Sequence, residues 1–218
     1  MIRLEQVSKH YGPAQNRIPA IDEVSLQIAK AEFVMVTGPS GSGKTTLLNL
    51  IAGMTRPDRG SIVIAGRDLL AMPDSERSRL RSRSIGFIFQ FQAMLPTLSA
   101  IDNVRLPLLF AGRPDDPQLA VSILAKVGLA DRQNAFASEL SAGQQRRVCI
   151  ARAIIIKPAL LICDEPTGDL DHETANLIMA LIGKAHHEGA TVVMATHNLE
   201  LCPGADRTLR LKTGRISG

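Results

Sequence analysis

The sequence predicts an α/β protein whose core is a parallel β-sheet with helical crossovers. Short apolar runs typical of buried strands occur at residues 33–37, 85–89, 160–163 and 191–195. Helical spacing of apolar residues separates these runs, and strand–helix–strand order is typical of a parallel sheet. From about residue 91 to residue 157 the helical spacing replaces the strand signal, which indicates a helical insertion.

The first half of the chain is rich in strands. Alternating apolar positions such as Ile2, Leu4 and Val7 predict strands within the first 30 residues. The run FVMVT at residues 33–37 predicts a buried strand that ends in a turn. Residues 44–53 have one apolar helical face, and a turn and a strand are expected at residues 58–66.

The second half is mainly helical until the last two apolar runs. Spacings such as Leu119, Ile123 and Val127 predict helices in the insertion. Residues 173–187 form a further helical stretch, and the tail predicts a hairpin with its turn at Thr213–Gly214. We therefore expect a single domain, in which a core (residues 1–90 and 158–218) carries a helical subdomain (residues 91–157).

Composition excludes several classes of protein. Of 218 residues, 45% are hydrophobic and 21% charged, so a sizeable core is expected. Aromatic residues make up only 3%, which argues against platforms that stack sugars or single-stranded nucleic acid. Arg3 and Glu5 interrupt the start, so no signal peptide is expected, and no apolar stretch of about 18 residues predicts a transmembrane helix.

Several candidate groups are better explained by structure than by chemistry. The three cysteines lie in apolar runs without metal-ligand spacing, which predicts buried reduced thiols in a cytosolic protein: Cys149, Cys163 and Cys202. Solvated helix positions are expected for His172, His186 and His187. The net charge is +4, and a solvated face is expected for the basic run that carries Arg77, Arg79, Arg81 and Arg83.

A phosphate-binding loop is the clearest motif. Between a predicted strand and a predicted helix, the chain fits G-x-x-x-x-G-K-[ST] with Gly38, Pro39, Ser40, Gly41, Ser42, Gly43, Lys44 and Thr45. Glycines allow backbone N–H groups to surround a phosphate, and the positive end of the helix points at the same anion. Lys44 is expected to reach the β- and γ-phosphates and the Thr45 hydroxyl to ligate Mg²⁺.

Two adjacent carboxylates end the strand predicted at residues 160–163. Asp164 and Glu165 repel each other unless a cation or a proton lies between them. Neighbouring strand residues point to opposite faces, so Asp164 is expected to face Mg²⁺ while Glu165 faces an attacking water. An N-cap acid for the next helix would explain only one of the two.

The stretch LSAGQ, residues 140–144, opens another predicted helix. Ser141 is a natural N-cap, yet small residues at a helix N-terminus also form a phosphate pocket. With a phosphate loop and this second predicted pocket in one chain, the sequence resembles the ATP-binding cassette (ABC) ATPases over nearly its whole length. The motifs stand in the family's order: Tyr11, the phosphate loop, Gln90, LSAGQ, LLICDE, Gly168-Asp169-Leu170-Asp171 and His197.

The resemblance implies a fold, a partner and a set of residue roles. The fold is a P-loop NTPase core with an antiparallel β subdomain and the helical insertion. Two copies pair head to tail, so that Ser141, Gly143 and Gln144 of one copy contact the γ-phosphate held by the other. The implied nucleotide-binding residues also include Tyr11, which stacks on adenine, Thr46 and Asp171, which links the two sites.

The resemblance also implies ATP hydrolysis with Mg²⁺. Glu165 activates the water, His197 contacts the γ-phosphate and orients Glu165, and Lys44 stabilises charge. Gln90 touches Mg²⁺ and the water and signals to the membrane partner; the metal ligands are thus Thr45, Gln90 and Asp164. Ala142 departs from the family's usual glycine, so its Cβ is expected to hinder either close approach or a positive φ. Asp169 stands where asparagine is frequent.

Residues 95–112 and EPTGDLD resemble the lipoprotein-release, macrolide-exporter and cell-division branch of the family. This resemblance implies integral membrane permease subunits as partners, on the cytoplasmic side of a bacterial inner membrane, and no nucleic acid. The alternative is an ABC-type ATPase acting on DNA or ribosomes. About 120 residues separate Lys44 from Asp164, which leaves no room for the long coiled coil of chromosome-maintenance ATPases. A plain P-loop kinase lacks LSAGQ and His197.

Overall fold

The computed structural model describes residues 1–13, 15–91, 94–168, 170–197 and 204–217. Its core is a six-stranded sheet of order β10-β9-β3-β8-β7-β6, in which only the β9–β10 pair is antiparallel. The strands are β3 (Phe33–Thr37), β6 (Ile85–Ile88), β7 (Leu160–Asp164), β8 (Thr191–Ala195), β9 (Arg207–Lys212) and β10 (Arg215–Ile216). The predicted parallel core sheet is confirmed.

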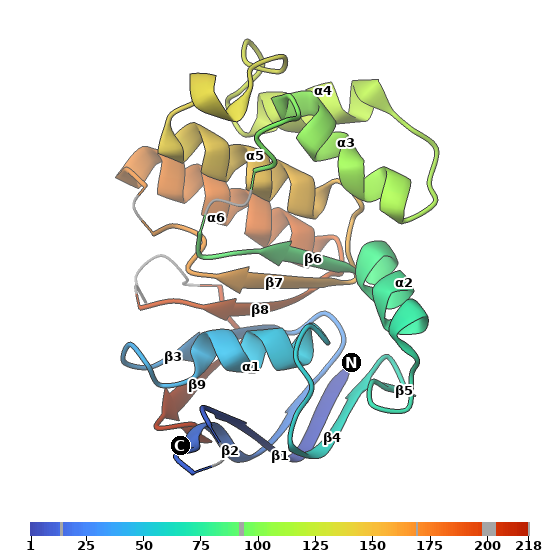
Figure 1. The fold of residues 1–218 in the computed structure, drawn as a ribbon. Helices are drawn as coiled ribbons and strands as arrows, with labels where there is room; N and C mark the ends of the chain where they lie inside the picture. The colour runs from blue at the N-terminus through green and yellow to red at the C-terminus, as the bar shows by residue number, and fades with distance from the viewer. Residues whose placement is uncertain (14, 92–93, 169, 198–203, 218) are drawn as a thin grey trace.

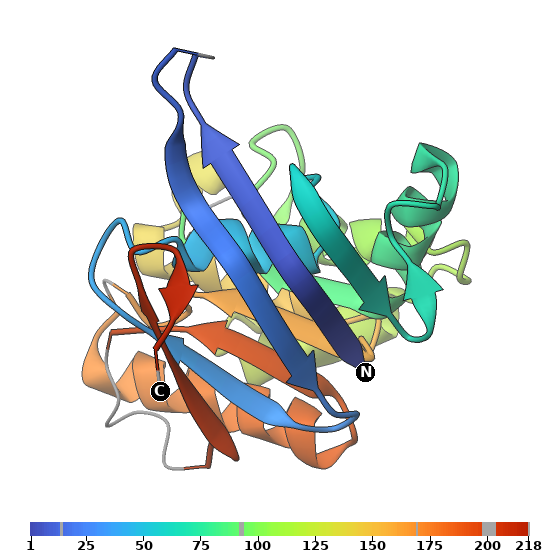
Figure 2. The same cartoon turned by 90° about the horizontal axis from the view of Figure 1, so that it is seen from below.

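A second sheet is antiparallel and lies below the first (Figure 1). Its order is β2-β1-β4-β5, from β1 (Ile2–Tyr11), β2 (Ile18–Ile28), β4 (Arg59–Ile64) and β5 (Arg67–Asp68). Seen from below, β1 and β2 form a long hairpin that projects past the other elements (Figure 2). The strands predicted for the first 30 residues belong to this sheet.

Helix α1 (Lys44–Ile51) lies between the two sheets (Figure 1). Its side chains Leu47, Leu48, Leu50 and Ile51 are fully buried, in one apolar cluster with residues of both sheets. A helix that is apolar on several sides is stable only where it is covered on several sides. The position of α1 therefore fixes how the two sheets face each other.

The other face of the core sheet is covered by α5 (Ala142–Ile154) and α6 (His172–His187) (Figure 1). Helices α3 (Ala100–Phe110) and α4 (Pro117–Lys126) and the short 3-10 helix η1 (Ala137–Glu139) lie beyond α5, and α2 (Asp74–Ser84) lies at the edge near β6. Helices α3, α4 and α5 share an apolar cluster, which includes Val104, Leu124 and Val148, separate from the cluster around α1.

Local predictions are confirmed in most places and wrong in two. Thr213 and Gly214 have φ values of 47° and 78°, as the turn of the β9–β10 hairpin requires. Cys149 and Cys163 are buried, whereas Cys202 lies outside the described residues. Arg77 is not solvated: it is buried in α2 and donates to the carbonyls of Leu69 and Met72, both at 3.3 Å.

His186 is not simply solvated either. Its ring packs edge-on against Phe33, and Nε2 lies 3.0 Å from the Ala31 carbonyl. In the described ranges no helix is both long and apolar enough to cross a membrane.

Gly86 provides a test of the packing between β6 and α5. A Cβ at this position would meet the Ala153 carbonyl and would lie 2.9 Å from Cγ of Pro158. Because backbone cannot yield as a flexible side chain does, Gly86→Ala should lower the free energy of unfolding by about 2 kcal/mol. Denaturant unfolding measures the change.

Gly183→Ala is the matched control, because Gly183 lies within α6 and a Cβ there meets nothing within 4 Å. Alanine favours a helix, so this variant should gain up to about 1 kcal/mol. Equal stability of the two variants would contradict the packing described here.

Candidate active site

The phosphate-binding loop joins β3 to α1, at the carboxyl end of the core sheet. Two of its glycines lie against backbone: a Cβ on Gly38 would meet the Leu211 carbonyl of β9, and one on Gly43 the Ala20 carbonyl of β2. Gly43 is also the N-cap of α1 with φ 104°, a backbone conformation that residues other than glycine rarely adopt. The loop is therefore held close to both sheets.

Polar groups of the loop have capacity for an anion. Lys44 Nζ donates to the carbonyls of Gly38 at 2.8 Å and Pro39 at 3.2 Å, so the ammonium lies over its own loop. The hydroxyl of Ser42 is buried and has no hydrogen-bond partner among the described residues. A buried polar atom without a partner is costly, and a bound phosphate would supply one.

Asp164 ends β7 and is only 3% exposed. The Thr45 hydroxyl donates a hydrogen bond to its carboxylate. Burial, helped by the negative charge of Glu165, raises the pKa of Asp164, although the Thr45 hydrogen bond and the charges of Lys44 and Arg146 oppose the rise. The ionised carboxylate is thus unfavourable until a cation approaches it.

Glu165 follows in a left-handed conformation, with φ 48°. Its N–H donates to the Ala195 carbonyl of β8 at 2.9 Å. His197, just after β8, places Nδ1 2.9 Å from Oε2 of Glu165, while its own side chain is 75% exposed. The sequence-predicted pair of Glu165 and His197 is therefore in direct contact.

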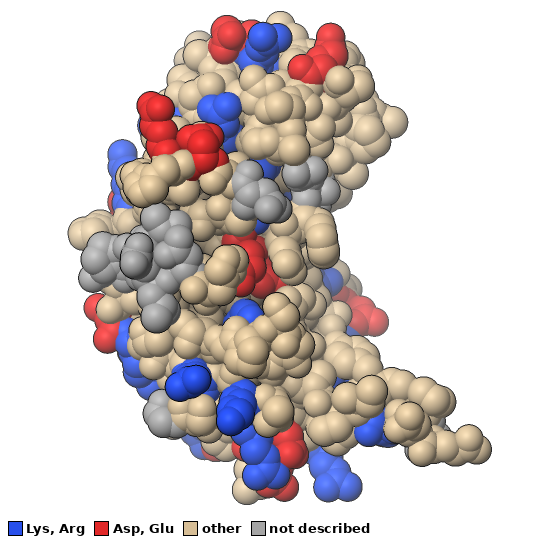
Figure 3. Space-filling model, turned by 90° about the vertical axis from the view of Figure 1, so that its left-hand side faces the viewer, with Lys and Arg blue, Asp and Glu red and all other residues tan. Residues whose placement is uncertain are grey.

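These groups surround a cleft of about 290 Å³. The residues that line it come from β2, the phosphate loop, α1 and the ends of β6 and β7: Ala20, Ser40, Gly41, Gly43, Lys44, Thr45, Thr46, Gln90, Asp164 and Glu165. On the face shown in Figure 3, acidic atoms are visible near the middle of the surface, between its upper and lower halves. Three motifs far apart in the sequence thus meet at one place.

At this cleft, Thr45 offers a hydroxyl oxygen, Asp164 a carboxylate oxygen and Gln90 an amide oxygen as metal ligands. Such hard oxygen donors fit Mg²⁺, which usually takes one or two protein groups and leaves its other positions to phosphate and water. Consistent with so small a donor set, the described part of the chain has no cluster of three or more His, Cys, Asp or Glu residues arranged to hold a metal.

Other predicted site residues do not line this cleft. Tyr11 is the last residue of β1, on the hairpin that projects in Figure 2. It is 46% exposed, and Lys9 Nζ lies 5.6 Å from its ring centroid. Asp171 is the N-cap of α6, where hydrogen bonds from the N–H and hydroxyl of Thr174 lower its pKa. Its neighbour Asp169 lies outside the described residues.

The LSAGQ residues also lie outside the cleft. Ser141 and Gln144 form a capping box at the start of α5: Ser141 Oγ accepts from the Gln144 N–H at 3.2 Å, and Gln144 Oε1 accepts from the Ser141 N–H at 2.9 Å. Gly143 lies near Leu170. Ala142 is the first helical residue and is not among the residues of positive φ, so the expected conflict with a positive φ is wrong. The Ala142 side chain is exposed, so its Cβ is still expected to hinder the close approach of another group to the start of the helix.

Sequence reasoning missed Arg146. Its guanidinium is buried and donates to the carbonyls of Gln90, Pro166 and Glu165. The available signal was a charged residue on the apolar face of α5, one turn before the buried Ile150.

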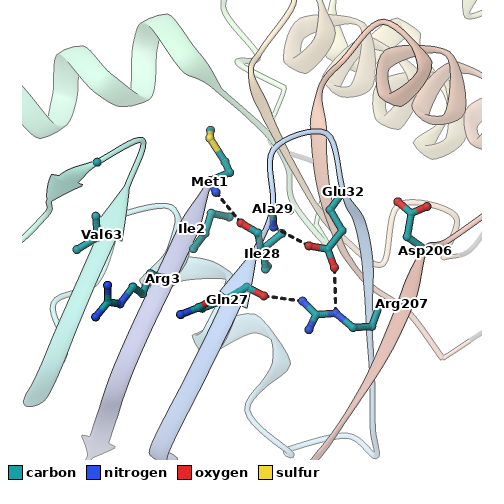
Figure 4. A pocket seen from close by; sticks show the side chains of 11 residues that line it. Met1, Ile2, Arg3, Gln27, Ile28, Ala29, Glu32, Val63, Asp206 and Arg207 are labelled. Atoms are coloured by element: carbon teal, nitrogen blue, oxygen red, sulfur yellow. Dashed lines mark hydrogen bonds and ion pairs between the residues drawn. The ribbon is translucent and has the colours of Figure 1, made fainter.

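A larger opening than this cleft lies elsewhere. It has a volume of about 760 Å³ and lies near the start of β3 and β9, where several of its polar groups are paired with one another or with nearby backbone (Figure 4). Arg207 Nε contacts Glu32 at 2.9 Å, and Glu32 accepts from the Ala29 N–H at 2.6 Å. Asp206 accepts from the Phe33 N–H at 2.7 Å. Such paired groups indicate a structural junction.

Comparisons with known proteins agree with this geometry. The sequence profile of the ABC transporter family matches residues 21–168. The lipoprotein-releasing system ATP-binding protein LolD of Geobacter metallireducens is 39% identical over 99% of this chain and 97% of its own length. The macrolide export ATP-binding/permease protein MacB of Aggregatibacter actinomycetemcomitans is 37% identical over 99% of this chain, which covers 34% of that longer protein.

A solved structure is similar throughout. The dimeric ATP-binding cassette MJ0796, in a post-hydrolysis state with ADP and Pi, has a TM-score of 0.95 and 36% identity, over 100% of this chain and 97% of its own. The predicted fold and the resemblance to the lipoprotein-release and macrolide branch are confirmed. These relatives favour a transport ATPase over one that acts on DNA or ribosomes.

Lys44→Ala should weaken ATP binding on the order of 10- to 100-fold, because it removes the ammonium over the loop and its charge-assisted contact with phosphate. Equilibrium binding of a fluorescent ATP analogue measures the affinity. Lys184→Ala, an exposed lysine of α6 paired with Glu188, is the control and should leave the affinity unchanged. Parental affinity in Lys44→Ala would contradict the assignment of the loop.

Asp164→Asn should stabilise the nucleotide-free protein at pH 7. The raised pKa means that the ionised carboxylate disfavours the fold at neutral pH, and that this penalty vanishes as the pH falls through the raised pKa towards about 4. The gain in melting temperature should therefore shrink over the same range.

Asp171→Asn, whose parent carboxylate has a lowered pKa, should give no such gain. Thermal unfolding of both variants between pH 7 and about 4 provides the comparison. A gain for Asp164→Asn that does not depend on pH would show that charge is not its cause.

Proposed function

Because the chain belongs to the ABC transporter family, as a subunit that binds and hydrolyses ATP, we propose that it drives a membrane protein by closing and opening an ATP-bound pair of its own copies. The observation that carries this proposal is the cleft in which Lys44, Asp164 and Glu165 meet. A phosphate loop, a buried carboxylate and a second carboxylate oriented by a histidine are the parts that phosphoryl transfer to water needs.

The triphosphate lies along the loop from Gly38 to Thr46 in this proposal. Backbone N–H groups and Lys44 bind the β- and γ-phosphates, and the buried hydroxyl of Ser42 gains a partner. Thr45, Asp164 and Gln90 would hold Mg²⁺, and the ion would neutralise charge on the phosphate oxygens. The Thr45–Asp164 hydrogen bond brings the first two of these ligands together before any metal binds.

Hydrolysis proceeds by in-line attack of water on the γ-phosphorus. The water oxygen forms the new bond while the bond to the β–γ bridging oxygen breaks, giving ADP and inorganic phosphate. Glu165 accepts the proton of the water or orients it, and His197 holds the Glu165 carboxylate through its Nδ1 contact. Lys44 stabilises the charge that develops on the phosphate oxygens.

A second copy completes the site. Within one chain, Ser141 caps its own helix and lies outside the cleft, although its exposed helix N-terminus is suited to an anion. We place Ser141, Gly143 and Gln144 of one copy against the γ-phosphate of the other, with Asp171 between the two sites. The dimeric state of the similar cassette MJ0796 supports this arrangement.

Tyr11 is assigned to the adenine ring. Its exposed ring on the β1–β2 hairpin is free to stack on a base, and Lys9 already lies over one face. The remaining face is the one available to a nucleotide.

The membrane partner is an integral permease, and the chain lies on the cytoplasmic face of a bacterial inner membrane. Next to Gln90, Phe91 is 79% exposed and Leu95 41% exposed. Exposed apolar side chains of this size are typical of protein interfaces. We assign the boundaries of the moving parts to residues 91–157, because the helices in this range have their own apolar cluster.

Glu165→Gln tests the reaction and the dimer together. The substitution keeps the shape but loses the base, so turnover should fall by a factor of roughly 10² or more. ATP still binds through the loop, and one negative charge near the γ-phosphate is lost, so an ATP-dependent dimer should persist on size-exclusion chromatography. Without nucleotide the parental chain should be largely monomeric.

The control is Glu188→Gln, which removes an exposed glutamate at the end of α6 and should keep parental turnover. Near-parental turnover in Glu165→Gln would move the search to His197 and Asp171. A tight dimer without ATP would argue against nucleotide-linked pairing.

A further inference from the structure

A buried arginine connects the helix that starts at Ser141 to the two loops that carry Gln90 and Glu165. Arg146 lies near the start of α5 and is 5% exposed. Its Nη1 donates to the Gln90 carbonyl at 2.9 Å and its Nε to the Pro166 carbonyl at 3.0 Å. Its Nη2 donates to the carbonyl of Glu165. One guanidinium thus joins three backbone carbonyls from two remote loops.

Packing alone does not call for an arginine here. Arg146 shares its helix face with Ile150 and Ala153, both buried, so an apolar side chain would suit the surroundings. Burying a cation is costly unless its N–H groups find acceptors, and the fork of five donors in arginine matches several carbonyls at once. What Arg146 adds is therefore its set of contacts.

Of the three residues whose carbonyls Arg146 contacts, Glu165 is the one with a left-handed backbone. Its φ of 48° lies in the left-handed region, which non-glycine residues rarely adopt. The Ala195 carbonyl holds its N–H at 2.9 Å, and Arg146 holds its carbonyl. The direction of the side chain follows from this backbone, and small misplacements of a catalytic group slow a reaction strongly.

We propose that Arg146 is a positioning residue that fixes the backbone of Glu165 and Gln90 to helix α5. This inference rests on the proposed role of Glu165 as the catalytic carboxylate. Ser141 and Arg146 belong to the same helical segment, five residues apart, so a displacement at the helix N-terminus reaches both loops through a rigid element. Contact of Ser141 with a partner-bound nucleotide and alignment of Glu165 are then one event.

The chain offers a matched control in the next residue. Arg147 is half-buried in the same helix and donates to the carbonyls of Val127 at 2.9 Å and Gly128 at 3.2 Å. Both acceptors lie within the helical insertion. Arg147→Met, like Arg146→Met, removes a guanidinium that donates to backbone carbonyls, two for Arg147 against three for Arg146, but it leaves the loops of the cleft untouched.

The test measures steady-state ATP hydrolysis with Mg²⁺, equilibrium binding of a fluorescent ATP analogue and melting temperature. Arg146→Met should lower kcat on the order of 10- to 100-fold while the Kd for nucleotide changes less than about threefold. Arg146→Lys keeps the charge but reaches fewer carbonyls, so its kcat should be intermediate. Arg147→Met should keep kcat within about twofold.

A double-substitution cycle separates positioning from a general structural role. If Arg146 acts through Glu165, Arg146→Met should lower the residual turnover of Glu165→Gln by less than about threefold. Full additivity of the two losses would overturn the proposal. Equal losses of kcat in Arg146→Met and Arg147→Met would do the same, as would parental kcat in both Arg146→Lys and Arg146→Met. Parental turnover in Glu165→Gln alone would instead refute the proposed catalytic carboxylate.

Discussion

The close approach of the phosphate loop to backbone carbonyls of both sheets is the constraint on which the rest of the site depends. Gly38 lies against the Leu211 carbonyl of the core sheet and Gly43 against the Ala20 carbonyl of the antiparallel sheet. The turn between β9 and β10 fastens this arrangement, because Gly214 donates to the Ser42 carbonyl at 3.0 Å and accepts from the Asp22 N–H at 2.9 Å. The loop takes its shape only when both sheets are in place.

Charge imposes the second condition. The negative Asp164 and Glu165 lie next to a loop built to hold further negative charge, and protein side chains offset only part of the repulsion. In the proposed function, a cation held by the oxygen donors of Thr45, Asp164 and Gln90 would resolve this conflict when it arrives with the nucleotide. The arrangement of charges therefore suits the nucleotide-bound site, whereas the nucleotide-free site carries the electrostatic cost of a buried carboxylate.

The sequence was sufficient where local patterns decide the structure. The strand at residues 33–37, the phosphate loop, the acid-tipped strand β7 and the turn at Gly214 follow from apolar runs, glycine positions and adjacent acids. It was insufficient where burial depends on distant carbonyls. Arg77 and Arg146 resemble surface residues by type, yet each is buried because backbone acceptors from other segments surround its guanidinium.

The other misjudgements have local causes. Helix α2 has almost no apolar periodicity, so nothing in residues 74–84 predicted its buried side. The concern about a positive φ at Ala142 came from the family's glycine, whereas Ser141 places the start of the helix so that residue 142 is already helical. Tyr11, Ser141 and Asp171 do not line the cleft of the single chain, so the nucleotide contacts proposed for them rest on the family resemblance.

The helical insertion has an apolar cluster of its own beside the clusters of the core, and this bears on how cooperative the molecule is. Residues around Val104 and Leu124 bury one another, while α1 and both sheets bury a different set. Contacts such as those of Arg146 and Gly86 join the two bodies across α5. The helical insertion is therefore able to open at a smaller free-energy cost than the whole chain, and amide hydrogens of α3 and α4 should exchange with solvent through such partial openings. Those of the central strands β7 and β8 should exchange only when the entire core comes apart.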